Sequence, residues 1–199
     1  MKTFGAIIAI SLTAGSANAA DFSFAGEFNH NDEVQEFNFT VAEAAADVTL
    51  RTWSFAGGTN AQGTVIERGG FDPIVSLFDG STAAQISHND DGGLVHDPVS
   101  GLSYDSFLMN NLSAGSYTAT VTQYRNFPVG TLADGFGGSF QTNFSDRDSH
   151  WALDVLNVES ASLGASYISA VGPIPEPETY ALLLAGLGLI GFMIRFRQV

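Results

Sequence analysis

Four oxygen-bearing side chains in the middle of the chain have the composition of a calcium site: Asp72, Asn89, Asp90 and Asp91. They flank two apolar stretches, residues 73–78 and 83–87, which are separated by Asp79 and Gly80. An Asp-Gly pair is a strong signal for a two-residue β-hairpin turn, which would bring the flanking residues together at one edge of a sheet. Calcium binds about six to eight hard oxygen ligands. The sequence therefore predicts a calcium site at these four residues, with calcium as the only cofactor.

The same residues have a second interpretation, because Asp and Asn next to Gly form turns without any bound ion. The run 89–92 lacks the alternating ligands and the distal glutamate of an EF-hand loop, so both interpretations stay open. His88 and His96 flank the acidic run, and a transition-metal site is a further alternative. Three more acidic residues are candidates to complete the site: Asp79, Asp97 and Asp105.

Aromatic side chains are the candidates for ligand recognition, since an aromatic face can stack on the apolar face of a sugar ring. Tyr124 and Phe127 stand at the end of an expected strand, just before a proline. We expect both at the surface, as a binding pair for carbohydrate. Trp53 and Trp151 lie within strand patterns, and we expect both to be buried in the core.

Motifs for covalent catalysis are missing from the sequence. The chain has no cysteine, no Gly-x-Ser-x-Gly motif and no glycine-rich phosphate loop with a lysine. A pair of carboxylates for glycoside hydrolysis has no sequence spacing by which it could be recognised. We therefore predict that the protein is not an enzyme, with a secreted hydrolase as an alternative.

Period-2 alternation of apolar and polar residues predicts that the body of the chain is all-β. The strands are expected at residues 22–28, 37–41, 48–53, 73–78, 83–87, 107–109, 116–124, 151–158 and 167–171. In the stretch 116–124 three threonines share one face, which we expect to point to solvent. Short strands separated by Gly and Asx turns favour an antiparallel β-sandwich of jelly-roll-like topology.

The charge of the chain is strongly negative, with 21 acidic residues against 7 Lys and Arg and a formal net charge of −14. Such a surface repels nucleic acids and anionic lipid head groups, so neither is an expected partner. The absence of cysteine also excludes a disulfide framework and thiolate metal sites.

The N-terminus has the three parts of a secretory signal peptide, which we assign to residues 1–19. Lys2 supplies the positive charge, residues 4–12 the apolar stretch, and Ala17-Asn18-Ala19 the small-residue cleavage site. Cleavage is expected after Ala19, with Ala20 as the competing site. The β-sandwich domain is then expected at residues 20–171.

The C-terminus combines a proline-rich spacer, residues 172–179, with an apolar stretch and a basic end. The stretch 180–194 contains no charged residue, and Arg195 and Arg197 follow it. At about 1.5 Å per residue it is a short span for a bilayer core of about 30 Å. Basic residues just beyond it fit the positive-inside rule, so we predict one transmembrane helix within residues 180–199. A buried core helix is the alternative.

This tail resembles the PEP-CTERM sorting signal of exported proteins from Gram-negative bacteria that make exopolysaccharide. The matching residues are Pro175, Glu176 and Pro177, the apolar stretch, and Arg195 with Arg197. The resemblance implies recognition and cleavage by the membrane transpeptidase exosortase. It also implies membrane attachment through the helix before processing, and later localisation at the cell surface, outer membrane or extracellular matrix.

Residues 22–158 are similar to the β-sandwich of bacterial pre-peptidase C-terminal-type domains. The similarity rests on residues 70–73 with 77–79, on 89–92, on 112–117 and on 151–154. It implies a jelly-roll ectodomain and says little about function.

These observations together predict an exported, non-enzymatic protein of the cell surface or extracellular matrix, associated with exopolysaccharide or biofilm. A carbohydrate-binding or calcium-dependent adhesion module with a defined ligand is the first alternative, and a secreted hydrolase is the second.

Overall fold

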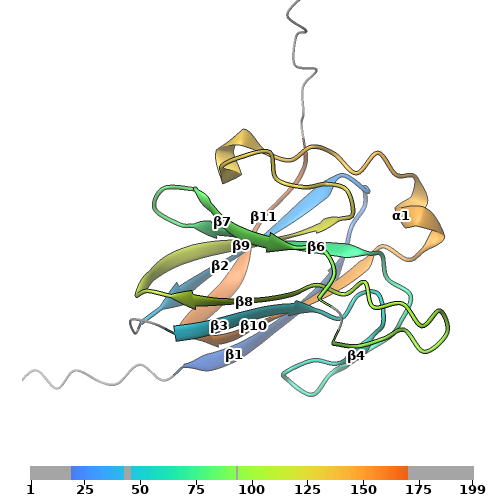
Figure 1. Cartoon of the computed structure of the whole chain (residues 1–199), viewed down its shortest axis with the longest axis horizontal. Coiled ribbons are helices and arrows are strands. Elements are labelled where there is room, and N and C mark those ends of the chain that lie inside the picture. Colours follow the sequence, from blue (N-terminus) through green and yellow to red (C-terminus); the bar gives the residue numbers. More distant parts are fainter. Residues whose placement is uncertain (1–18, 43–45, 93, 170–199) are drawn as a thin grey trace, which may run out of the picture.

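The computed structural model describes residues 19–42, 46–92 and 94–169, and these residues form two antiparallel β-sheets (Figure 1). The four-stranded sheet has the order β1 (Ala20–Glu27), β10 (His150–Val158), β3 (Ala46–Thr52) and β8 (Phe107–Leu112). The five-stranded sheet has the order β11 (Ser160–Ile168), β2 (Glu33–Val41), β9 (Gly115–Gln123), β6 (Pro73–Asp79) and β7 (Gln85–Asn89). The predicted all-β, antiparallel class is therefore confirmed.

Three expected segments fall outside the described residues: almost all of the signal peptide, the spacer 172–179 and the C-terminal helix 180–199. Within the part that the structure does describe, no helix has the length and apolar character needed to cross a bilayer. The helices that it does contain are a 3-10 turn at Leu132–Asp134 and the short α1 at Asn143–Asp146.

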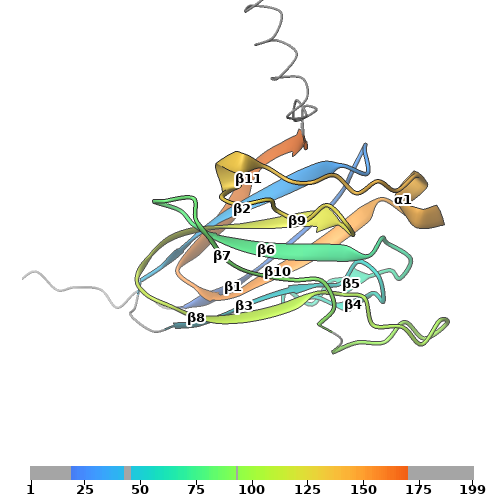
Figure 2. The same cartoon turned by 45° about the horizontal axis from the view of Figure 1, so that its top comes forward.

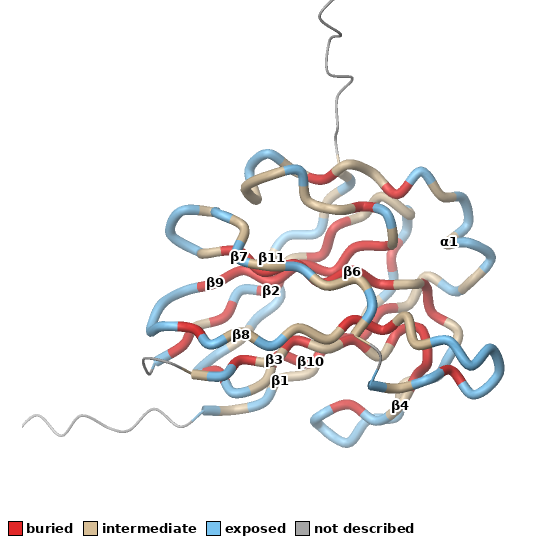
Figure 3. Tube along the Cα trace, viewed as in Figure 1, coloured by how far each residue is buried: buried red, intermediate tan, exposed pale blue. Residues whose placement is uncertain are grey.

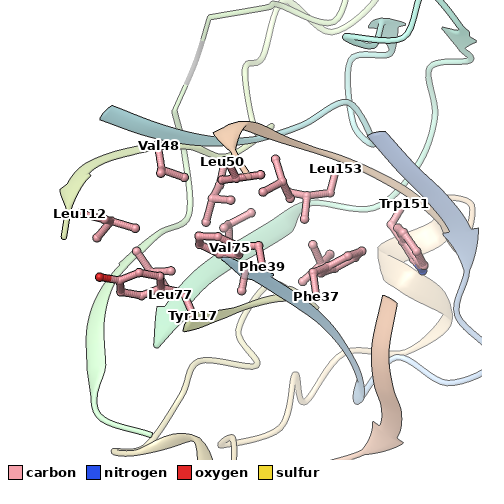
Figure 4. Packing of buried hydrophobic residues seen from close by; sticks show 14 of the residues in the cluster. Phe37, Phe39, Val48, Leu50, Val75, Leu77, Leu112, Tyr117, Trp151 and Leu153 are labelled. Atoms are coloured by element: carbon pink, nitrogen blue, oxygen red, sulfur yellow. The ribbon is translucent and has the colours of Figure 1, made fainter. Parts of the chain in front are cut away.

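Figure 2 shows the two sheets as two layers, and apolar side chains from both meet in one core between them (Figure 4). Phe37 and Phe39 on β2 face Leu50 on β3 and Leu153 on β10 across this space. Trp151 is 4% exposed and lies edge-on to Phe37, with ring centroids 5.4 Å apart. The burial predicted for Trp151 is confirmed, and Figure 3 shows that buried residues follow the strands while most loops are exposed.

The β6–β7 hairpin forms as predicted, but its turn is longer than two residues. The Asp79 backbone N–H donates to Ala84 O, and the Asp79 carboxylate accepts hydrogen bonds from Ser81 and Thr82. An Asp side chain that holds the turn from within allows extra residues before the chain returns. The returning strand is therefore Gln85–Asn89 and not residues 83–87.

The threonine face of β9 is buried, which corrects the expectation that it points to solvent. Thr120 and Thr122 are both 0% exposed. The Thr122 hydroxyl donates to Asn126 O, and Phe136 packs on Val34 and Phe78 from the same outer side of the sheet. The segment after β9 thus folds back over this face, and Figure 1 shows it in yellow to orange beside the five-stranded sheet.

Three smaller differences concern single elements. Trp53 is half-buried, because its indole N–H donates to Asp154 on the outer side of the four-stranded sheet. The last strand, β11, begins at Ser160, seven residues before the expected start of 167–171. The glycine-rich stretch after Trp53 contains a small ribbon of β4 (Gly58–Thr59) and β5 (Val65–Ile66).

Candidate functional site

The β6–β7 hairpin brings together three of the four residues predicted to bind calcium. Asp72 lies directly before β6, and Asp90 and Asp91 directly follow β7. Val75 pairs with Asn89, so these two strand ends lie side by side. One carboxylate oxygen from each of Asp72, Asp90 and Asp91 lies within 4.8 Å of the others. We call these three residues the acidic cluster.

The surroundings of the acidic cluster disfavour the ionised form of its carboxyl groups. Burial, together with the charges of Asp90 and Asp91, raises the pKa of Asp72 to about 8. Burial and the charge of Asp91 raise the pKa of Asp90 to about 6, and burial also raises the pKa of Asp91. Arg147 opposes the shift at Asp72, but its guanidinium donates to the carbonyls of Gly70 and Phe55.

Two oxygens of the acidic cluster lack partners among the described residues. Asp72 Oδ1 and Asp90 Oδ1 are both buried, and neither has a hydrogen-bond donor within the described ranges. A buried polar atom normally has a partner, and each exception asks for an explanation such as a bound ion or water. Carboxylate oxygens that converge without donors are the arrangement that a divalent cation requires.

The fourth predicted ligand, Asn89, turns toward the backbone. Its side-chain oxygen accepts a hydrogen bond from the Phe107 backbone N–H at 3.1 Å, and its amide group donates to Asp91 O. The Asn89 carbonyl accepts from the Ser106 hydroxyl, which also binds the carbonyls of Pro73 and Asp90. Asn89 and Ser106 therefore fix the backbone beneath the acidic cluster.

The three additional acidic candidates have structural partners elsewhere. Asp79 caps its own turn, and Asp97 pairs with Arg68, whose Nε lies 2.5 Å from Asp97 Oδ1. That hydrogen bond lowers the pKa of Asp97 well below its usual range. Asp105 accepts hydrogen bonds from Thr52 and from the N–H groups of Phe55 and Ala56. It contributes negative charge near Asp72 but lies outside the acidic cluster.

Glycine at position 92 allows the chain to leave the acidic cluster. A Cβ atom there would lie 2.1 Å from the Phe107 backbone nitrogen, a distance that no side chain can have. The Gly92 N–H donates to Asp105 O at 2.9 Å. The close approach brings the loop after Asp91 against the beginning of β8.

The predicted carbohydrate pair, Tyr124 and Phe127, lies beside the acidic cluster. The two rings are perpendicular, with centroids 6.2 Å apart, and both residues are half-buried. The Tyr124 backbone N–H donates to Asp72 O at 2.8 Å, which ties the aromatic pair directly to the acidic cluster. Both candidate sites thus lie where β6 begins and where β7 and β9 end.

Two residues that were not predicted as ligand contacts from the sequence lie beside the aromatic pair. His88 on β7 is exposed, and its ring centroid lies 5.6 Å from that of Phe127. The Arg125 guanidinium lies over the Tyr124 ring at 5.6 Å. We call Tyr124, Arg125, Phe127 and His88 the aromatic corner. Arg125 could have been found from the sequence, because it stands between two aromatic residues at a strand end. The place of His88 beside Phe127 could not, because it depends on the register of β7.

Residues 173–198 match the PEP-CTERM protein-sorting motif. The Pro-Glu-Pro tripeptide, the apolar stretch and the two arginines that we predicted to form this signal all lie within the match. The motif indicates an exported protein that exosortase sorts to the outside of the cell. No curated protein matches the chain.

Proposed function

We propose that the chain is a non-enzymatic protein of the cell surface or extracellular matrix that associates with exopolysaccharide after exosortase has processed it. The observation that carries the proposal is the sorting motif at residues 173–198. A strongly acidic body with a net charge of −14 suits an exported protein that has to stay soluble in a matrix. The aromatic corner supplies the surface through which it contacts the polysaccharide.

A hydrolase is the competing interpretation, since a carboxyl group with a pKa near 8, such as Asp72, can act as a general acid. The acidic cluster favours binding over catalysis. It gathers three carboxylates, and two of their oxygens are buried without a donor among the described residues, whereas a glycosidase places two carboxyls on opposite sides of the bond that breaks. Turnover of any polysaccharide by the purified protein would reverse this assignment.

Processing and matrix association are tested together in cells. Mass spectrometry of the protein from cells with exosortase should find a C-terminus near Pro175, and cells without the enzyme should retain the full tail. In fractionation, the processed protein should sediment with exopolysaccharide and move to the soluble fraction in cells that make none. The same distribution in both strains would refute the association with exopolysaccharide, and an intact tail in both would refute the processing.

A second candidate function is a calcium-dependent adhesion module, which the two unpartnered oxygens of Asp72 and Asp90 favour. A cation at the acidic cluster would draw on the three carboxylates, and it would neutralise charge that helps to raise the pKa of Asp72 and of Asp90. Millimolar calcium should raise the melting temperature by several degrees, and Asp90→Ala should abolish that rise. Glu27→Ala, which removes an exposed carboxylate at the end of β1, is the matched control and should leave the rise intact.

The likeness of the sandwich to pre-peptidase C-terminal-type domains belongs to the same proposal. Apart from the β6–β7 hairpin, the strands of the two large sheets alternate between them along the chain, as in β1, β2 and β3. This interleaving is the connection pattern of a jelly roll, in which two Greek keys share one sandwich. It supports the likeness in architecture and adds no activity.

A further inference from the structure

Arg125 differs from every other arginine that the structure describes, because no acceptor binds its guanidinium. Arg51 pairs with Asp154, Arg68 pairs with Asp97, and Arg147 donates to two backbone carbonyls. Arg125 is exposed, and among the described residues its guanidinium contacts the Tyr124 ring and has no hydrogen-bond or ion-pair partner. In a chain with 21 acidic residues, a free guanidinium is exceptional.

The contact with Tyr124 holds the guanidinium without using its hydrogen-bond donors. A guanidinium carries five N–H donors, and the contact of Arg125 with the Tyr124 ring, at 5.6 Å from Cζ to the ring centroid, leaves them available. A planar fork of this kind matches the two oxygens of a carboxylate. Arg125 is therefore presented for an anionic group that the chain itself does not supply.

The backbone around Arg125 is held rigidly by Asn126. Asn126 is 0% exposed, its amide donates to Ser169 Oγ at 2.9 Å and its oxygen accepts from the Gly138 N–H at 2.8 Å. The Thr122 hydroxyl binds its carbonyl at 2.8 Å. These bonds fix the chain on both sides of Arg125 before any ligand arrives, which lowers the entropy cost of binding.

We propose that the aromatic corner binds a carboxylate-bearing sugar residue of a polysaccharide, with Arg125 as the residue that determines the preference for acidic sugars. This inference rests on the proposed association with exopolysaccharide and names the class of sugar. Of the two perpendicular rings, one stacks on the C–H face of the pyranose and the other contacts its edge. Arg125 binds the carboxylate, and His88 lies close enough to Phe127 to contact a ring hydroxyl.

The net charge of the protein makes Arg125 necessary for such a ligand. A surface with a net charge of −14 repels polyanions at long range, so an acidic glycan gains nothing from general electrostatic attraction. At an ionic strength of about 0.15 M the repulsion is screened beyond about 8 Å, and a direct ion pair then outweighs it. The local cation, and not the overall field, decides which glycan binds.

The test is titration calorimetry of the full-length chain in mild detergent with two tetrasaccharides, tetragalacturonate and the neutral cellotetraose. The wild-type protein should bind tetragalacturonate at least tenfold more tightly. Arg125→Gln should remove this preference by weakening tetragalacturonate alone, and Arg125→Lys should restore part of it. Phe127→Ala should weaken both ligands. Phe140→Ala, at an aromatic residue that is 85% exposed, is the matched control and should change neither.

The other possible outcomes distinguish the proposed role of Arg125 from the proposed association with exopolysaccharide. Equal affinity of the wild-type protein for both tetrasaccharides, or an unchanged preference in Arg125→Gln, overturns the role of Arg125 and leaves the association with exopolysaccharide standing. Absence of binding to both, in a protein that still sediments with exopolysaccharide in cells, overturns the aromatic corner as the binding site. Absence of both binding and sedimentation overturns both proposals. Melting curves of each variant exclude unfolding as the cause.

Discussion

Asp154 and Asp72 both keep carboxylate oxygens away from solvent, and their surroundings are opposite. Asp154 on β10 is 0% exposed and accepts hydrogen bonds from the Ser23 hydroxyl, Arg51 Nε, Trp53 Nε1 and the Ala61 N–H. Asp72, before β6, has a buried Oδ1 without a donor among the described residues and two other carboxylates close by. The chain supplies hydrogen-bond donors to the carboxylate of Asp154, whereas Asp72 keeps a buried oxygen that accepts no hydrogen bond from the described residues.

This difference separates a structural carboxylate from a binding one. The donors around Asp154 come from β1, β3 and the segment before β5, so the side chain joins three parts of the four-stranded sheet's outer face. The charge at Asp72 destabilises the fold until something positive arrives. Folded proteins tolerate such local cost mainly where a ligand compensates it. Substitutions at the two positions should therefore have opposite signs.

The largest effect is expected from Asp154→Ala. It leaves the Arg51 cation and several N–H and O–H donors without their acceptor, and breaking a buried pair in this way costs about 3 to 5 kcal/mol. Urea denaturation followed by tryptophan fluorescence measures the loss in the free energy of unfolding. The effect should be the same with calcium and with chelator. A loss below about 1 kcal/mol would mean that Asp154 does not hold this face together.

Asp72→Asn should stabilise the protein in chelator by about 2 kcal/mol at pH 7.5, because folding then no longer requires the carboxyl either to take up a proton or to enter the cluster with its charge. In millimolar calcium the sign should reverse, since the variant loses a ligand of the ion while the wild-type protein gains the binding free energy. The same urea denaturation, run in both buffers, measures the two differences. A destabilised variant in chelator would show that Asp72 already has a favourable partner.

The pH dependence of stability in chelator should follow the raised pKa values of the cluster. The folded state keeps a proton on Asp72 up to about pH 8 and on Asp90 up to about pH 6, whereas an unfolded Asp loses it near pH 4. The folded state therefore binds more protons between these limits, and stability falls as pH rises, by at most about 1.4 kcal/mol per pH unit for each proton.

Asp105, outside the cluster, contributes a slope of the same sign because burial raises its pKa, whereas the Arg68-paired Asp97 does not. Asp97, whose pKa is lowered by Arg68, contributes stability that is constant above about pH 4 and lost only below that value. Melting temperatures from pH 5 to pH 8 measure the slope, which should be shallower in Asp72→Asn than in the wild-type protein. A stability that rises with pH over this range would contradict the assignment.

Local pattern was enough to predict that Asp72 and the Asp90–Asp91 pair meet. Two apolar stretches around an Asp-Gly signal define a hairpin, and the ends of a hairpin lie together even when the turn has an unexpected length. The all-β class followed from period-2 alternation in the same way. These features depend on residues close in sequence, which is why they could be read without the structure.

Apart from the turn after Asp79, which Ser81 and Thr82 lengthen locally, the main incorrect expectations depend on residues distant in sequence. The β9 threonines looked solvent-facing because nothing near them predicts that Phe136 covers their face. Asn89 looked like a ligand because its partner, the Phe107 N–H, lies at the start of a later strand. The free guanidinium of Arg125 becomes visible only when the partners of the other arginines are known. Tertiary partners, not propensities, decide each case.

The smallest effect is expected from Asp91→Asn, and it refines the comparison within the cluster. Asp91 is exposed, so its charge is largely solvated, and the variant should change stability in chelator by less than about 0.5 kcal/mol. Its carboxylate still lies within 4.8 Å of the other two, so calcium affinity should fall about tenfold in a titration that follows the melting temperature. Asp91 would then act on the ion alone, whereas Asp72 acts on both the ion and the fold. Equal effects of Asp91→Asn and Asp72→Asn in chelator would mean that burial does not distinguish the two carboxylates. In that case the destabilisation at the acidic cluster would come from repulsion among its carboxylates and not from their desolvation.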